Sequence, residues 1–97
     1  MGFGYVLATE SLITDHKRVG YMYRECSTAD DSGWRFFAGD ESRDYLNEPN
    51  NINVYSVKTI LEIDSSILPY LNSPPYSSYR RDNKTGEFLF DTFSPGK

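Results

Sequence analysis

The sequence predicts a single α+β domain, with about five mostly antiparallel strands and short helices inserted mid-chain and packed on one face of the sheet. Short aromatic segments bounded by turn residues in both halves of the chain indicate the strands, and polar helix caps in the middle indicate the helices. The 97 residues can form one modest core but not two. We expect one domain over residues 1–97, with its core at about 3–91 and a tail at 92–97.

The N-terminal half contains three segments that we expect to form strands. Residues 3–9 are rich in β-forming side chains, residues 19–25 alternate between two faces, and residues 33–38 are aromatic and follow a polar turn. All three patterns are typical of strands. Residues 15–18 are polar and predict a hairpin-type connection. The second and third segments are so close in the chain that we expect them to pair antiparallel.

The third segment contains the only tryptophan, Trp34. Because side chains alternate along a strand, Trp34 and Phe36 share one face, while Arg35 and Phe37 share the other. Burying an aromatic side chain stabilises a fold by about 1.5–3 kcal/mol, so the Trp34 face should pack in the core. Residues 39–46 then form a glycine turn followed by the start of a helix, with carboxylates at its positive end.

The middle of the chain predicts a turn and two short helical segments. Residues 47–53 are rich in asparagine and contain a proline, which favours a turn. Ser56 should cap a helix over residues 57–63, and Asp64 a second helical segment over 65–68.

The last part of the domain predicts a hairpin. Residues 76–81 and 87–91 have the composition of strands and flank the turn-forming residues 83–86. The alternation of the second strand places Phe88 and Phe90 on one face, and we expect both to point inward.

Charge favours a protein partner over a nucleic acid. The chain has a net charge of −4, so nucleic-acid binding is not expected. Residues 25–48 hold seven carboxylates and two arginines. Such a locally acidic stretch, if exposed, would speed encounter with a basic partner. The sequence opens with no basic-then-apolar leader and contains no apolar run near ~18 residues, so we expect a cytoplasmic protein without a membrane partner.

The residues predict no catalytic, metal or cofactor site. His16 is the only histidine and lies in a polar connection, and Cys26 is the only cysteine and is expected to be a small buried thiol. Asp40, Glu41 and Asp44 do not follow the spacing of a calcium loop. We therefore expect no catalytic residues, no bound metal and no cofactor.

Four pieces of the chain form a recognisable series: VGYMYRE, SGWRFFAGDES, DYLNEPNNINVYSVKTI and IDSSILPYLNSP. Together they resemble a bacterial family, first described as a domain of unknown function and then grouped with the immunity proteins of polymorphic toxin systems. The resemblance spans residues 5–91, with Tyr76 at a position where the family tends to have glycine. It implies a non-catalytic cytoplasmic protein that protects its producer by binding a toxin. Its most specific positions are Ser32, Gly33, Trp34, Phe36, Phe37, Gly39, Asp40 and Glu41.

Three functions stay open from the sequence. The leading one is a non-catalytic immunity protein that binds and neutralises a cognate toxin domain. The alternative is a regulatory or scaffold interaction module, with a homodimer as one form. A small hydrolase or ligand-binding protein would instead need a deep pocket lined by Asp40, Glu41 and Arg35. For the toxin contact surface we predict Asp40, Glu41, Arg43, Asp44 and Tyr45.

Overall fold

The computed structural model describes residues 4–26, 30–82 and 84–92, with the backbone alone described for residues 91 and 92. The predicted α+β class is confirmed, with six strands in one sheet. The elements are β1 (Tyr5–Thr9), α1 (Glu10–Thr14), β2 (Tyr21–Arg24), β3 (Asp31–Phe37), α2 (Arg43–Asn47), the 3-10 helix η1 (Pro49–Asn51), β4 (Ile52–Ser56), α3 (Val57–Ile63), the 3-10 helix η2 (Ser65–Tyr70), β5 (Ser77–Arg81) and β6 (Phe88–Thr92).

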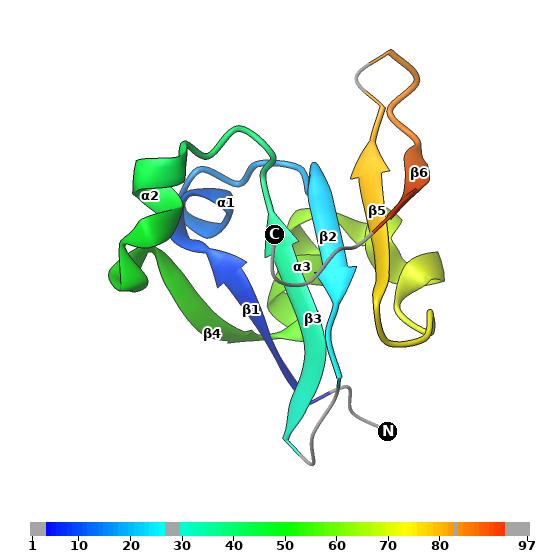
Figure 1. The fold of residues 1–97 in the computed structure, drawn as a ribbon, viewed down its shortest axis with the longest axis horizontal. Helices are drawn as coiled ribbons and strands as arrows, with labels where there is room; N and C mark the ends of the chain where they lie inside the picture. The colour runs from blue at the N-terminus through cyan, green and yellow to red at the C-terminus, as the bar shows by residue number, and fades with distance from the viewer. Residues whose placement is uncertain (1–3, 27–29, 83, 93–97) are drawn as a thin grey trace.

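The sheet has the strand order β4-β1-β3-β2-β5-β6 (Figure 1). β1 and β3 pair parallel, and the other four pairs are antiparallel, so the prediction of a mostly antiparallel sheet is confirmed. The predicted antiparallel pairing of β2 with β3 is also present. The prediction of a hairpin-type connection between β1 and β2 is wrong. Residues 10–14 form α1, and β3 lies between β1 and β2 in the sheet.

One face of the sheet carries the core. Trp34 and Phe36 are fully buried with their rings stacked 5.8 Å apart, as the alternation of β3 predicts. The indole Nε1 of Trp34 donates to the Leu71 carbonyl at 3.1 Å, so its one polar group is satisfied. Helices α1, α3 and η2 supply the covering layer, and α3 lies behind the strands in Figure 1. The core side chains are Val6, Ala8, Leu12, Val19, Met22, Trp34, Phe36, Ile60, Ile67, Leu71 and Phe88.

The helix caps of the middle segment form as predicted. The Ser56 hydroxyl accepts from the Thr59 N–H at the start of α3, and the Asp64 carboxylate accepts from the Ser66 N–H at the start of η2. The turn predicted at 47–53 is correct only in part. Residues 52–56 form the edge strand β4 against β1, because β-forming Val54 and Tyr55 follow the asparagines.

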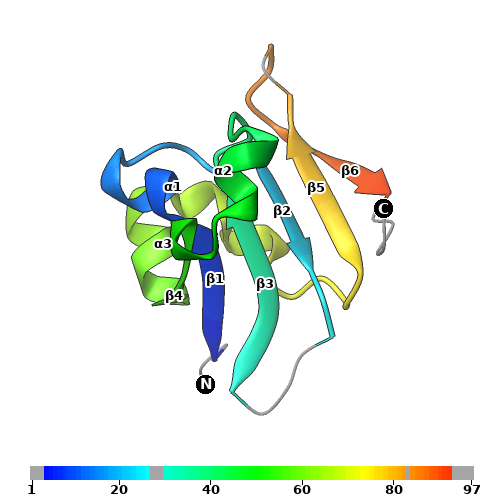
Figure 2. The same ribbon diagram turned by 60° about the vertical axis from the view of Figure 1, so that its left-hand side comes forward.

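The C-terminal hairpin is confirmed, but the placement of Phe90 is not. Phe88 is buried and meets the Tyr70 ring of η2 at 5.2 Å, whereas Phe90 is 72% exposed. β6 is the edge strand farthest from α1 and α3 (Figure 2). Phe90 contacts the Tyr79 ring at 5.8 Å but lies outside the buried core, so sharing a strand face with Phe88 does not bury it.

Phe3 of the predicted core and residues 93–97 of the predicted tail lie outside the described residues. Within the described part of the chain, no helix has the length and apolar character needed to cross a membrane.

Candidate functional site

The second face of the sheet carries an aromatic cluster instead of a helix layer. Tyr21 and Tyr23 on β2 and Phe37 on β3 point to this open face, opposite Met22 and Phe36. The three rings contact one another with centroids 5.8–5.9 Å apart. Each of these rings keeps part of its surface exposed. Tyrosine and phenylalanine in this position are typical of the core of protein–protein interfaces.

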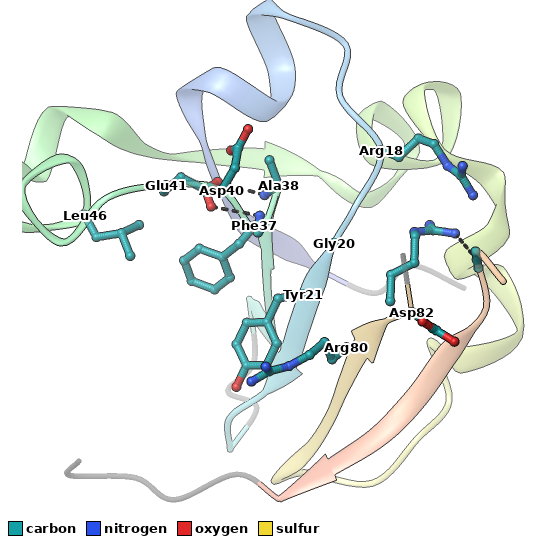
Figure 3. A pocket seen from close by; sticks show the side chains of 13 residues that line it. Arg18, Gly20, Tyr21, Phe37, Ala38, Asp40, Glu41, Leu46, Arg80 and Asp82 are labelled. Atoms are coloured by element: carbon teal, nitrogen blue, oxygen red, sulfur yellow. Dashed lines mark hydrogen bonds between the residues drawn. The ribbon is translucent and has the colours of Figure 1, made fainter. Parts of the chain in front are cut away.

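A groove of about 740 Å³ lies at the end of this open face. Figure 3 shows Asp40, Glu41 and Leu46 on the side of Phe37, Arg80 beside Tyr21, and Arg18 and Asp82 on the opposite side of the groove. Gly20 forms part of the base, where a Cβ atom would collide with the Ala38 carbonyl. The groove is lined by Arg18, Gly20, Tyr21, Phe37, Ala38, Gly39, Asp40, Glu41, Leu46, Arg80, Arg81, Asp82 and Gly86.

The acidic wall is built by Glu41. Its Oε2 accepts hydrogen bonds from the Thr9 hydroxyl at 2.6 Å and the Ala38 N–H at 2.7 Å. Its Oε1 accepts from the Gly39 N–H at 2.9 Å. These charge-assisted bonds fold the turn after β3 and fasten it to the end of β1. Asp40, next in the turn, is exposed and pairs with Lys17 at 2.9 Å. Hydrogen bonding to Asp40 raises the pKa of Lys17.

Helix α2 continues this wall. Ser42 caps it by accepting from the Tyr45 N–H, and the Tyr45 hydroxyl accepts from the Ser11 N–H of α1 at 2.8 Å. Arg43 and Asp44 are exposed on its first turn. The five predicted contact residues therefore lie together, but in two roles. Asp40, Arg43 and Asp44 present their side chains to the outside, whereas Glu41 and Tyr45 make internal hydrogen bonds.

The opposite wall is anchored by a buried ion pair between Arg81 and Asp64. Their side chains are 9% and 7% exposed, and Nη2 of Arg81 lies 2.6 Å from Oδ2 of Asp64. Arg81 also donates to the Val19 and Gly86 carbonyls at 2.7 and 2.6 Å. This network ties β5 to α3 and to the hairpin turn, so Arg81 is a structural residue of the wall.

The pKa values of Asp64 and Arg81 are both lower than the ordinary values of these groups. Burial by itself would raise the pKa of Asp64, but hydrogen bonds from Ser66 and the Val19 N–H outweigh it and lower that pKa. Burial lowers the pKa of Arg81 and, helped by the nearby positive charge of Arg18, outweighs the pull of Asp64. An arginine pKa is ordinarily above about 12, so the ion pair stays charged at neutral pH.

The acidic stretch at residues 25–48 does not form one surface. Glu25 and Asp31 lie at the start of β3, and both bind Arg35, at 2.9 and 2.7 Å. Hydrogen bonding to Arg35 lowers the pKa of Asp31. Asp40 and Asp44 lie beyond the other end of this seven-residue strand, about 20 Å away at ~3.3 Å per residue. A pocket lined jointly by Asp40, Glu41 and Arg35 is therefore absent from the described residues, because Arg35 does not line the groove.

Several family-motif positions hold the structure of β3. The Ser32 hydroxyl donates to the Tyr5 carbonyl at 2.8 Å and accepts from the Trp34 N–H at 3.2 Å. Gly33 has φ +91, and a Cβ atom there would collide with the Glu25 carbonyl. An L side chain would be strained at this position even without the collision. Ser32, Gly33, Trp34 and Phe36 therefore build the sheet, while Phe37, Gly39, Asp40 and Glu41 line the groove.

The lone histidine and cysteine do not form a pair. His16 precedes β2 and Cys26 follows it, so they lie at opposite ends of the strand. Cys26 is exposed, which corrects the expectation of a buried thiol. Among the described residues, no group of three or more His, Cys, Asp or Glu side chains gathers as a metal site would.

Sequence reasoning found the acidic wall of the groove but missed its floor and its basic wall. The alternation of residues 19–25 put Tyr21 and Tyr23 on one face, and this was the available sign of the aromatic floor. Nothing in the sequence placed Arg18 and Arg80 in one groove, because their segments come together only through the pairing of β2 with β5.

The domain is thus a small α+β domain with a covered core face and an aromatic open face that ends in a charged groove. Its sequence matches the family model described as "Immunity protein Imm33 domain" over residues 6–90. This match spans most of the 97 residues, and the chain belongs to the Imm33 immunity protein family. Comparison with curated proteins and comparison with solved structures gave no match.

Proposed function

We propose that this chain is a non-catalytic immunity protein that binds and neutralises a cognate bacterial toxin domain in the cytoplasm of the producing cell. The observation that carries the proposal is the match to the Imm33 domain over residues 6–90. The open sheet face supports it, because a binding protein needs exposed aromatic and charged side chains at a fixed position. Neutralisation then follows from occlusion of the toxin.

The exposed side chains of the acidic turn and α2 form the proposed contact surface. Asp40 and Asp44 supply negative charge that steers a basic toxin surface, and Arg43 between them can anchor a carboxylate or an aromatic ring. Glu41 and Tyr45 contribute by holding the turn and the helix in place, through their bonds to Thr9 and Ser11.

The test is co-purification of this chain with the toxin domain encoded beside its gene. The variant is Asp40→Lys combined with Asp44→Lys, and Glu41 is left intact because its reversal would disturb the fold. Reversing two steering charges should weaken binding by about tenfold or more. A matched control, Glu62→Lys combined with Asp30→Lys, makes the same change of net charge at two other exposed sites. Equal binding by both double variants would remove this contact surface.

The edge strand β6 favours a second function, a homodimeric interaction module. Leu89 is 55% and Phe90 72% exposed, and an edge strand with exposed apolar side chains can pair with another copy. Sedimentation of the purified chain at increasing concentration tests it. A dimer that Phe90→Lys abolishes would support this module, whereas a monomer at all concentrations would exclude it.

A further inference from the structure

The walls of the groove differ in how their charges are satisfied. On the acidic wall, Glu41 makes three internal hydrogen bonds and Asp40 pairs with Lys17. On the opposite wall, the Asp82 carboxylate accepts from the Lys84 N–H at 3.1 Å and from the Thr85 hydroxyl at 3.2 Å, within the hairpin turn. The groove carboxylates are thus already engaged in contacts within the domain.

The arginines of the groove are not all engaged in this way. Arg81 is bound by Asp64 and two backbone carbonyls. Arg18 is exposed, and among the residues that the structure describes no carboxylate lies within ion-pair distance of it. Its positive charge opposes the neighbouring Arg81 and contributes to lowering the pKa of that residue. An added carboxylate beside Arg18 would relieve this repulsion.

The floor of the groove is aromatic. Tyr21 and Phe37 line the groove with their centroids 5.9 Å apart, and Arg80 pairs with Tyr21 across the two strands. In Figure 3, Arg80 lies beside Tyr21, whereas Arg18 lies farther along the groove, with its Nη2 close to Gly86 of the hairpin turn. Arginine and aromatic side chains around a hollow are the groups that most often anchor a protein partner. A segment that complements them carries a carboxylate and an apolar side chain.

We propose that the groove receives an acidic segment of the toxin, with an Asp or Glu carboxylate against Arg18 and an apolar side chain of the same segment on Tyr21 and Phe37. This inference rests on the proposed function and adds the chemistry of the partner. The interface then contains two contacts of opposite charge. The α2 surface meets basic residues of the toxin, and the groove meets an acidic residue. Opposed charges of this kind fix the register of a complex.

The experiment measures the dissociation constant of the purified full chain and the toxin domain encoded beside its gene, by calorimetry. The variant is Arg18→Glu, and the matched control is Lys58→Glu, which makes the same charge change at an exposed site on α3. We expect Arg18→Glu to weaken binding by about tenfold or more and Lys58→Glu by less than about twofold. Changing to lysine the toxin residue whose carboxylate contacts Arg18 should restore binding to the Arg18→Glu variant and not to the unaltered chain.

Whether Arg18→Glu weakens or strengthens the affinity for the toxin distinguishes binding in the groove from general charge attraction. If a basic toxin were held only by the net charge of −4, adding negative charge through Arg18→Glu would strengthen binding. Stronger or unchanged binding by Arg18→Glu would overturn the inference. A self-association of the chain that Arg18→Glu abolishes would also overturn it, because a second copy would then occupy the groove. No binding of the unaltered chain to the toxin would instead contradict the proposed function itself.

Discussion

The carboxylate of Glu41 accepts a hydrogen bond from the hydroxyl of Thr9 at 2.6 Å, which joins the turn after β3 to the last residue of β1. Two further bonds, from the N–H groups of Ala38 and Gly39, fold the turn around the same carboxylate. Glu41 therefore sets the position of the acidic wall and of α2, which begins two residues later. A residue that looks like a surface acid in the sequence is a structural centre in the fold.

Glu41→Ala should therefore lower the free energy of unfolding by about 1.5–3 kcal/mol, because three donors lose a charged acceptor. The measurement is urea denaturation followed by circular dichroism. Glu62→Ala is the control, since Glu62 is exposed on α3, and its effect should stay within about 0.5 kcal/mol. Similar destabilisation by both substitutions would show that the hydrogen bonds of Glu41 do not hold the turn.

The stability of the domain should fall in acid in part through Asp64. The pKa of Asp64 is lower in the folded protein than its ordinary value, because hydrogen bonds from Ser66 and Val19 outweigh burial. Its contribution is fully present above the unfolded-state pKa of about 3.9 and is lost as the pH falls through the lower folded-state pKa. Between about pH 5 and 2, the free energy of unfolding should therefore fall less steeply with decreasing pH in Asp64→Asn than in the unaltered chain.

Asp31 provides the comparison for this prediction. Its pKa is also lowered, first through the hydrogen bond from Arg35, so it should contribute to the same acid limb. Asp31→Asn and Asp64→Asn should each make the free energy of unfolding less dependent on pH in acid. The double variant should reduce this dependence more than either single substitution. An acid limb of unchanged slope in Asp64→Asn would contradict the assignment.

Local patterns predicted much of the fold because the signals were local. The caps of α3 and η2 need a side chain and a backbone N–H only two or three residues apart, and the Trp34 face follows from alternation along a single strand. The parallel pairing of β1 with β3 joins residues that lie far apart in the chain, such as Tyr5 and Asp31, and no local pattern encodes it. The groove was missed for the same reason, since Arg18 and Phe37 belong to different segments.

Phe36 and Phe90 offer a direct test of where the core ends. Phe36 is fully buried and Phe90 is 72% exposed. Phe36→Ala should lower the free energy of unfolding by about 3–5 kcal/mol, through lost burial and a cavity. Phe90→Ala should lower it by less than about 1 kcal/mol. Urea denaturation checks both, and comparable losses would mean that Phe90 is covered in solution, for example by another copy.

Arg18 and Arg81 lie in the same groove, yet their substitutions should differ in effect. Arg81→Ala leaves the Asp64 carboxylate buried without its partner and should lower the free energy of unfolding by about 3–5 kcal/mol. Arg18→Ala removes an exposed charge that opposes Arg81, so stability should change by less than about 0.5 kcal/mol. Thermal and urea denaturation of the two variants side by side provide the measurement. A large destabilisation by Arg18→Ala would show that Arg18 has a structural partner and is not held available for a ligand. A stable Arg18→Ala variant that no longer binds the toxin would separate folding from recognition within one groove.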